Sequence, residues 1–198
     1  MAGDGVRARQ KEQTRQELLR EARRAFAAVG YGAVGLMEIV RAAGVTKGAL
    51  YHHFDSKEAL FRAVLAQVQE EVGGQVARAA GAEKDPWDQL TAGCAAFLAA
   101  GTDPEVQRIM MIDGPAVLGW AEWRALDEQS SARHLAEVLE ELVAAGVVAE
   151  QPVAPLVRLL SGAMNEAALW LATSEDPADL PATQRALERL LSALRAAN

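Results

Sequence analysis

The sequence lacks the features that stabilise small secreted proteins or carry a chain through a membrane. Its 198 residues include a single cysteine, Cys94, which cannot form a disulfide within the chain, so the fold does not depend on an oxidising compartment. No run of about 18 apolar residues is free of charges, and no basic segment followed by an apolar one opens the chain. We therefore expect a soluble, cytoplasmic protein with no membrane partner.

Residues for metal binding and catalysis are also scarce. The chain has three histidines. His52 and His53 are adjacent, so on a helix they diverge by about 100° and cannot hold one metal ion together. His134 has no second histidine within helical reach, and Cys94 lies in an alanine-rich segment that is typical of a small buried residue. Because nucleophile motifs and phosphate-binding glycine loops are missing too, we expect no metal, no cofactor and no enzyme. The alternative from a different functional class is a helical enzyme.

The composition is that of an ordinary globular protein of one or two domains, with 51% apolar and 24% charged residues. The net charge of -7 argues against a nucleic-acid partner, because phosphates repel an acidic surface. The charge is uneven, however. Residues 1–75 carry 11 Lys/Arg and 9 Asp/Glu, whereas residues 76–198 carry 9 and 18. This asymmetry indicates two functions in one chain, although a helix with a basic solvated face is a simpler interpretation.

The spacing of apolar residues is helical throughout, and no run alternates polar and β-branched residues over the length of a strand. Thr46 is placed to cap a third helix, and Asp55, three residues before Glu58, is placed to cap a long fourth one. The first helix is expected to bury Leu18, Ala22, Phe26 and Val29. The predicted helices lie near 11–29, 36–43, from 46 onwards, from 55 onwards, 86–101, 104–111, 121–145, from Pro152 or Pro155 onwards, and 179–196.

The most specific pattern runs from Leu36 to Phe54, where a turn containing Gly44 joins two short helices with the spacing of a helix-turn-helix. Leu50 and Phe54 are expected to point inward, so the other side of the second helix is exposed. That face is short, partly basic and contains a glycine that permits close approach, which suits the DNA major groove. Similar helix pairs also occur in bundles with no DNA role. The residues of this face are Thr46, Lys47, Gly48, Tyr51 and His52.

The segment IVRAAGVTKGALYHHF (39–54), followed by DSKEAL (55–60), resembles the DNA-binding domain of the TetR family of transcriptional regulators, as does the upstream stretch 25–31. The resemblance covers about residues 12–65. It implies an all-α homodimer with an N-terminal three-helix helix-turn-helix DNA-binding domain (10–56). A C-terminal helical ligand-binding and dimerisation domain (57–198) would follow, beginning with a long connecting helix at about 57–80.

The resemblance also implies which residues contact a double-stranded DNA operator. Lys47 and Gly48 are expected near base edges, and a further group near phosphates. Family members usually have a threonine or serine before the second helix, but Val34 and Gly35 stand there, which weakens the case for a phosphate contact. The expected phosphate contacts are Thr46, Tyr51, His52 and, at the start of the fourth helix, Lys57. Arg7, Arg9 and Lys11 are expected to form a DNA-contacting arm or an untethered basic tail.

The C-terminal half contains all four tryptophans, and it is here that the resemblance implies a pocket for a small effector of unknown identity. Asp113 and Glu166 would favour a cationic or hydrogen-bond-donating ligand if buried, and otherwise are solvated or salt-bridged carboxylates. The break at Met110–Pro115 is expected to couple the pocket to the fourth helix. The same residues can equally be ordinary core. The expected ligand-binding residues are Phe97, Met110, Met111, Asp113, Trp120, Trp123, Asn165 and Trp170.

The last two long helices are expected to form the dimer interface as an intermolecular four-helix bundle, as the resemblance implies. Its expected residues are Leu156, Leu160, Ala163, Ala167 and Leu191. A two-fold dimer predicts an inverted-repeat operator whose half-sites lie about 34–36 Å apart. The predicted function is a repressor released by a small apolar or aromatic effector. A DNA-binding regulator without an effector is the alternative.

Overall fold

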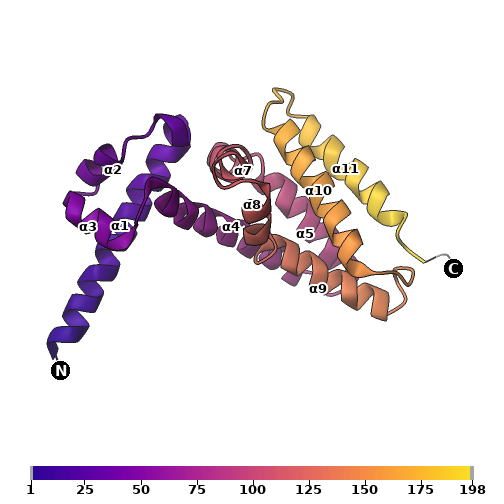
Figure 1. Cartoon of the computed structure of the whole chain (residues 1–198). Coiled ribbons are helices and arrows are strands. Elements are labelled where there is room, and N and C mark those ends of the chain that lie inside the picture. Colours follow the sequence, from indigo (N-terminus) through magenta and orange to yellow (C-terminus); the bar gives the residue numbers. More distant parts are fainter. Residues whose placement is uncertain (1, 197–198) are drawn as a thin grey trace.

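The computed structural model describes residues 2–196, and every regular element among them is helical (Figure 1). The all-α fold class is confirmed. One isolated β-bridge, between Val148 and Arg195, ties the C-terminal end to the loop after α9. The helices are α1 (Ala2–Ala33), α2 (Leu36–Ala42), α3 (Lys47–His53), α4 (Lys57–Gly81), α5 (Pro86–Ala100), α6 (Pro104–Val106), the π-helical η1 (Gln107–Asp113), α7 (Gly114–Leu118), α8 (Trp120–Asp127), α9 (Ser131–Ala144), α10 (Val153–Leu171) and α11 (Asp179–Ser192).

The N-terminal domain packs α1, α2 and α3 around an apolar core that the first half of α4 completes. The rings of Phe26 in α1 and Phe61 in α4 meet edge to face with their centroids 5.2 Å apart, a favourable geometry for aromatic pairs. The N-terminal part of α1 projects beyond the other helices (Figure 1). Arg7, Arg9 and Lys11 lie in this helical projection, so the expectation of an untethered tail is wrong for these residues, while their contact with DNA stays a prediction.

The end of α1 differs from its prediction because the chain kinks at Gly30, whose φ of 78° is accessible to glycine but strained for other residues. Helical backbone resumes after the kink and continues to Ala33. Val29, placed just before the kink, is 56% exposed, so its expected place in the core is wrong. Val34 covers that end of the core instead.

One predicted helix cap and one predicted helix boundary are also corrected. The cap of α4 is Ser56, whose hydroxyl accepts a hydrogen bond from the Ala59 N–H at 3.0 Å, whereas Asp55 is exposed one residue earlier. The single helix predicted for 121–145 is two helices, α8 and α9, which meet at a turn. Asp127 stabilises this turn because its carboxylate accepts a hydrogen bond from the Ser131 hydroxyl at 3.0 Å.

The C-terminal domain is a layered helical bundle. The helix α4 packs along α5 and against α9, while α10 lies on α5, α9 and η1, and α11 covers α5 and α10. The segment from α6 to α8 lies between this bundle and the N-terminal domain, since α6 and η1 both contact α1. Among the described residues, no helix combines the length and apolar character needed to span a membrane.

Candidate nucleic-acid interface and interior cavity

The short helix α3 is held in place by one capping bond and two buried side chains. The Thr46 hydroxyl accepts a hydrogen bond from the Ala49 N–H at 3.1 Å, so the predicted cap is confirmed. Leu50 and Phe54 are buried, as their spacing predicts. The opposite side of the helix is therefore fixed in orientation and open to solvent. Its exposed residues are Thr46, Lys47, Gly48, Tyr51 and His52.

Two lysines on this surface lie over aromatic rings. The Lys47 ammonium is 5.8 Å from the centre of the Tyr51 ring, and the Lys57 ammonium is 4.3 Å from that of Tyr31. Cation–π contacts of this kind restrain long side chains. Lys57 is the first residue of α4, where the helix dipole and free N–H groups also favour an anion. The position of Lys57 therefore suits a phosphate, and Lys47 is held on the exposed face of α3.

The start of α2 provides no side-chain oxygen. Gly35 is its N-cap, and the Gly35 N–H donates to the Glu38 carboxylate at 3.3 Å. The Glu38 carboxylate repels phosphate. The start of α2 is therefore poorly suited to a phosphate contact, in agreement with Val34 and Gly35 standing in place of the usual threonine or serine.

Ion pairs and one backbone bond join the two domains. The Arg23 guanidinium donates to Glu71 in α4 at 2.6 and 2.7 Å and to Glu105 in α6 at 2.7 Å, and these carboxylates raise the pKa of Arg23 despite its partial burial. Asp113, the last residue of η1, accepts a hydrogen bond from the Tyr31 N–H at 2.7 Å. The N-terminal domain is therefore held directly by the α6–η1 segment.

The close approach at that backbone bond explains the glycine beside it. A Cβ added to Gly30 would lie 3.1 Å from the Arg108 guanidinium and 3.4 Å from the Asp113 carboxylate. Gly30 thus serves both the kink in α1 and the contact with η1. A side chain there would press on the groups that join the domains.

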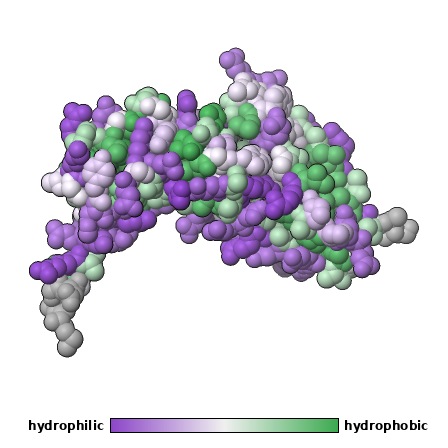
Figure 2. All heavy atoms as spheres, in the orientation of Figure 1, coloured by the Kyte–Doolittle hydropathy of each residue, from purple (hydrophilic) through white to green (hydrophobic). Residues whose placement is uncertain are grey.

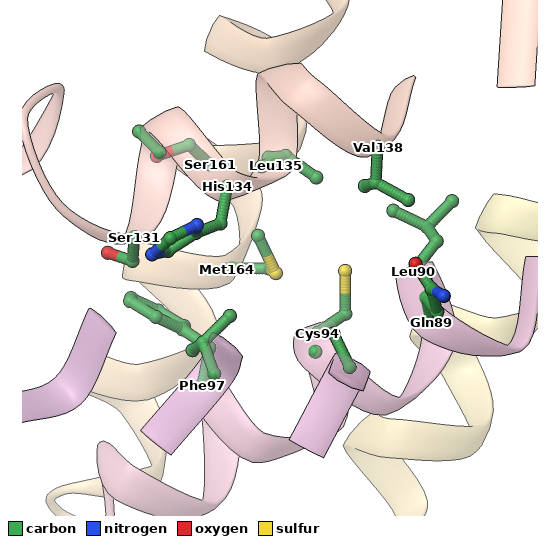
Figure 3. Close-up of a pocket in the computed structure, with 14 residues that line it drawn as sticks. Gln89, Leu90, Cys94, Phe97, Ser131, His134, Leu135, Val138, Ser161 and Met164 are labelled. Carbon is green, nitrogen blue, oxygen red and sulfur yellow. The ribbon is translucent and has the colours of Figure 1, made fainter. Parts of the chain in front are cut away.

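The C-terminal domain encloses a cavity of about 50 Å³ between α4, α5, α9 and α10 (Figure 3). The sulfur atoms of Cys94 and Met164 point into it, and burial raises the pKa of the Cys94 thiol to about 12. Cys94 is therefore a neutral wall residue, and its expected burial is confirmed. The remaining wall is apolar except for a few groups that can hydrogen-bond, namely Gln89, Ser131, His134 and Ser161.

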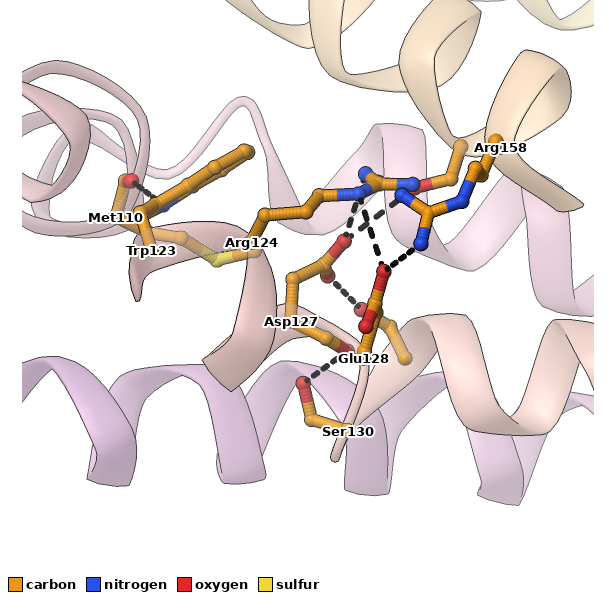
Figure 4. A network of polar contacts seen from close by, with 9 residues as sticks. Met110, Trp123, Arg124, Asp127, Glu128, Ser130 and Arg158 are labelled. Atoms are coloured by element: carbon orange, nitrogen blue, oxygen red, sulfur yellow. Dashed lines mark hydrogen bonds and ion pairs between the residues drawn. The ribbon is translucent and has the colours of Figure 1, made fainter. Parts of the chain in front are cut away.

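Two of these polar wall residues belong to a buried network (Figure 4). Asp127 is 1% exposed, and its carboxylate accepts hydrogen bonds from Ser131 at 3.0 Å and Ser161 at 3.3 Å and pairs with Arg124 at 3.2 Å. Burial raises the pKa of Asp127, while the two hydroxyls and the guanidinium lower it. Because Arg124 also bonds Ser161 at 2.9 Å, the network joins α8, α9 and α10 behind the cavity wall.

The predicted ligand residues do not gather around this cavity. Of the eight, Phe97 alone lines it. Met110, Met111 and Trp123 are buried, and the Trp123 indole donates to the Met110 carbonyl at 2.7 Å. Asp113 faces Tyr31 as described above, whereas Trp120 and Trp170 are 63% and 50% exposed. Asn165 is buried, and its amide has no hydrogen-bond partner.

Ser131, Ser161 and Gln69 were not among the site residues predicted from the sequence. Ser161 lies in an apolar helical stretch, where an inward hydroxyl indicates a buried polar partner, whereas Ser131 begins α9 among polar neighbours. The partner of either serine depends on tertiary contacts. Gln69 occupies the helical position shared by Leu65, Val72 and Val76 on the buried side of α4. A glutamine in that row was the available signal for a polar group in the core.

The predicted dimer residues divide into two groups. Leu156, Leu160 and Leu191 are buried within the protomer, whereas Ala163 is exposed and Ala167 is half-buried. The large exposed apolar side chains of the same two helices are Leu159, Trp170 and Leu190. Figure 2 shows hydrophobic surface gathered over the α10–α11 end of the molecule.

Two family models match separate parts of the chain. Residues 18–64 match the family model described as bacterial regulatory proteins, tetR family, and residues 87–194 match the model described as tetracyclin repressor-like, C-terminal domain. A crystal structure of a TetR-family transcriptional regulator from Pectobacterium atrosepticum is 36% identical to the chain, with a TM-score of 0.79. The match covers 95% of this chain and 97% of that one.

Curated relatives match over shorter lengths. The HTH-type transcriptional regulator UidR of Escherichia coli is 40% identical over 57 residues, which are 29% of each protein. The HTH-type transcriptional repressor Rv1474c of Mycobacterium tuberculosis is 32% identical over 110 residues, 54% of this chain and 57% of that protein. The chain thus spans less than two thirds of the length of either relative.

Proposed function

The chain belongs to the TetR family of transcriptional regulators, and on that premise we propose that it is a cytoplasmic repressor that binds an inverted-repeat operator as a homodimer and is released by a small effector. The observation that carries the proposal is the solvent-facing side of α3, fixed by the Thr46 cap and the buried Leu50 and Phe54. A rigid helix with exposed cationic and hydroxyl groups can enter the major groove.

Within that groove, Lys47 and Gly48 at the start of α3 approach the base edges. Thr46, Tyr51 and His52 contact phosphates on one side, and Lys57 contacts a phosphate at the start of α4. The cation–π contacts support these roles because they reduce the entropy lost when the two lysines are ordered on DNA.

The dimer interface uses the exposed rather than the buried side of α10 and α11. Leu159, Trp170 and Leu190 supply apolar area, and Ala163 allows close helix approach. Leu156, Leu160 and Leu191 support this face from within the protomer. A two-fold axis through it would present two copies of α3 to successive major grooves about 34–36 Å apart.

The effector binds in the cavity of the C-terminal domain and acts through the Asp127 network. Ser131 and Ser161 line the cavity and also hold Asp127, so a ligand that displaces either hydroxyl disturbs the junction of α8 with α9. Since buried charge pairs depend strongly on their remaining hydrogen bonds, a small movement there has a large energetic effect.

From α8 the disturbance can reach the N-terminal domain through two hydrogen bonds. Trp123 in α8 holds the Met110 carbonyl of η1, and Asp113 at the end of η1 holds the Tyr31 N–H. Both bonds are 2.7 Å long, and η1 also packs directly against α1. A shift of η1 would therefore reorient α1 relative to α4.

A regulator without an effector is the second candidate, favoured by the small size of the cavity. Its volume of about 50 Å³ is below the roughly 150 Å³ of an engineered cavity that holds benzene. In that case the network would serve stability alone, and DNA binding would respond to no small molecule.

The proposal is tested by the mobility of DNA from upstream of the protein's own gene in the presence of the purified full chain. We expect retardation, and we expect Lys47→Ala to weaken binding about ten- to hundred-fold, since a good base contact contributes about 1–3 kcal/mol. The matched control is Lys84→Ala, which removes an equally exposed lysine between α4 and α5 and should leave affinity unchanged.

The salt dependence of the same binding provides a second measurement. Because the first 75 residues carry a balance of only +2, we expect few released counter-ions. A slope corresponding to about ten ions, or equal losses from Lys47→Ala and Lys84→Ala, would contradict recognition by α3.

A further inference from the structure

Two buried carboxamides in the C-terminal domain have no hydrogen-bond partner. Gln69 in α4 is 1% exposed and Asn165 in α10 is 4% exposed, and all four of their amide nitrogen and oxygen atoms are unpaired. A primary amide has two N–H donors and an oxygen with two acceptor sites. Because buried polar groups are almost always hydrogen-bonded, two unpaired amides in one domain need an explanation.

The other buried polar side chains of this domain are satisfied by one another. Arg124, Asp127, Ser131 and Ser161 form the network behind the cavity wall, with every charged group paired. The unpaired amides are therefore not part of a generally polar core. Each unpaired amide destabilises the fold, because it makes no hydrogen bond that would offset its loss of hydration.

Neither amide lines the cavity, but each belongs to a helix that forms part of its wall. Asn165 lies one helical turn after Ser161 and next to Met164, both of which line the cavity. Gln69 lies two turns before Val76 on the same side of α4, and Val76 lines the cavity from that helix. The helices α4 and α10 both pack against α5, α9 and η1, so they enclose the same interior from two directions.

The residues around each amide show where it lies along the domain. One turn beyond Asn165, Ala168 packs against Gly101, where a Cβ would approach to 2.8 Å, and Gly101 ends the helix that leads to α6 and η1. Gln69 also lines a groove with Ser130 and His134, and His134 belongs to the cavity wall as well. The two amides are therefore buried polar groups on two of the helices that form the cavity wall, outside its present lining.

We propose that Gln69 and Asn165 determine effector specificity, and that the effector is an uncharged molecule with a small apolar body and a polar head that both donates and accepts hydrogen bonds, such as a carboxamide. This inference rests on the proposed function. The apolar body fits the wall formed by Leu90, Phe97 and Met164. Met164 can make room for it because its unbranched side chain has three rotatable bonds.

The absence of charge in the ligand follows from the charges of the wall. Among the residues that line the cavity none is a lysine, arginine, aspartate or glutamate. Asp127, behind the wall, is already paired with Arg124. An ammonium entering the cavity would lose its hydration without gaining a counter-ion, and a carboxylate could gain one only by protonation of His134.

Four ring compounds of similar size test this specificity: benzamide, toluene, benzoate and benzylamine. Titration of the isotope-labelled full chain, followed by NMR, gives a dissociation constant for each. We expect benzamide to bind most tightly, at least ten-fold better than toluene, and the two ions to bind most weakly. Benzamide binding no tighter than toluene, or an ion binding best, would overturn the proposal.

Variants Gln69→Leu and Asn165→Leu should separate binding from stability. Each should raise the melting temperature of the ligand-free protein, because an unpaired amide is removed, and lower the affinity for benzamide at least ten-fold while toluene binding is unchanged. The matched control is Gln75→Leu, the same change at an exposed position of α4, which should alter neither quantity. A lower melting temperature together with unchanged selectivity would assign the amides to the fold and overturn the proposal.

Should the leucine variants fail to fold, Asn165→Asp keeps the shape and exchanges the N–H donors for a negative charge. We expect it to move the preference from benzamide to benzylamine, and an unchanged order of affinities would contradict the assignment. Retardation of upstream DNA by the ligand-free protein is measured in parallel. Retained DNA binding with no benzamide preference rejects this inference alone, whereas loss of DNA binding in the unmodified protein rejects the proposed function.

Discussion

The interiors of the two domains differ in kind. In residues 5–56 every buried side chain is apolar, whereas all the buried polar and charged side chains among the described residues lie beyond α3. These are Gln69, Arg124, Asp127, Ser131, Ser161 and Asn165. The difference indicates that the domain that presents α3 is held together by apolar packing, whereas the domain with the cavity also depends on buried polar interactions.

The physical basis is the dependence of polar interactions on their surroundings. Apolar packing is non-directional and changes smoothly when a helix moves, while a buried ion pair loses most of its value when one hydrogen bond is broken. A polar interior therefore lowers the free energy of unfolding, but its interactions would change strongly if a ligand entered the cavity. The two domains can be compared directly by removing one buried group from each.

The largest effect is expected from Asp127→Ala. This variant leaves the Arg124 guanidinium buried without its nearest carboxylate, which typically costs about 3–5 kcal/mol of unfolding free energy. Glu128, whose carboxylate lies 3.9 Å from the Arg124 Nε, should keep the loss near the lower end of that range. Urea denaturation followed by circular dichroism measures the change.

The control for Asp127→Ala replaces both charged partners with apolar side chains, as in Arg124→Met combined with Asp127→Leu. Because no charge is then left unpaired, the double variant should recover most of the lost stability. Equal destabilisation by the single and double variants would mean that the network contributes through shape, and the contrast between the two interiors would lose its physical basis.

A somewhat smaller effect is expected from Leu50→Ala in the N-terminal domain. Leu50 is 1% exposed, and truncation of a buried leucine costs about 2–5 kcal/mol. DNA binding should be lost while helix α9 and the cavity stay intact by NMR. Val29→Ala in the same domain should change stability by less than about 0.5 kcal/mol, since Val29 is largely exposed. Similar losses from both variants would refute the positions given to these residues.

The smallest expected effect is a change in how the stability of the fold depends on pH. Burial lowers the pKa of His53 below its ordinary value, with His52 and nearby cations adding to the shift. The folded protein therefore binds fewer protons at this site than the unfolded one, so stability should fall as the pH drops through about 6.5 towards the folded pKa. Thermal unfolding between pH 7.5 and 5.5 should show a smaller decrease for His53→Gln than for the unmodified chain. An identical pH dependence would exclude His53 as the cause.

The N-terminal domain was largely predictable because its signals are local. The inward positions of Leu50 and Phe54 follow from helical spacing, and the Thr46 cap follows from residue type. The errors at Val29 and Asp55 arose at helix ends, where a kink or a neighbouring serine shifts the boundary by a residue or more.

The cavity was not predictable to the same extent because its walls come from four helices distant in sequence. Trp120 and Trp170 share a residue type with Trp123, yet they are exposed and Trp123 is buried. Nothing local distinguishes them. The turn at Asp127 likewise depends on Ser161, more than thirty residues away.

The π-helical form of η1 has a consequence for the direction in which Asp113 points. A π-helical turn contains one residue more than an α-helical turn, so rewinding it would advance everything beyond it by one position, about 100° around the axis. Asp113, at its end, would then face away from Tyr31. The extra residue between Gln107 and Asp113 would therefore allow the Asp113 carboxylate two orientations, which differ by one residue position along the helix.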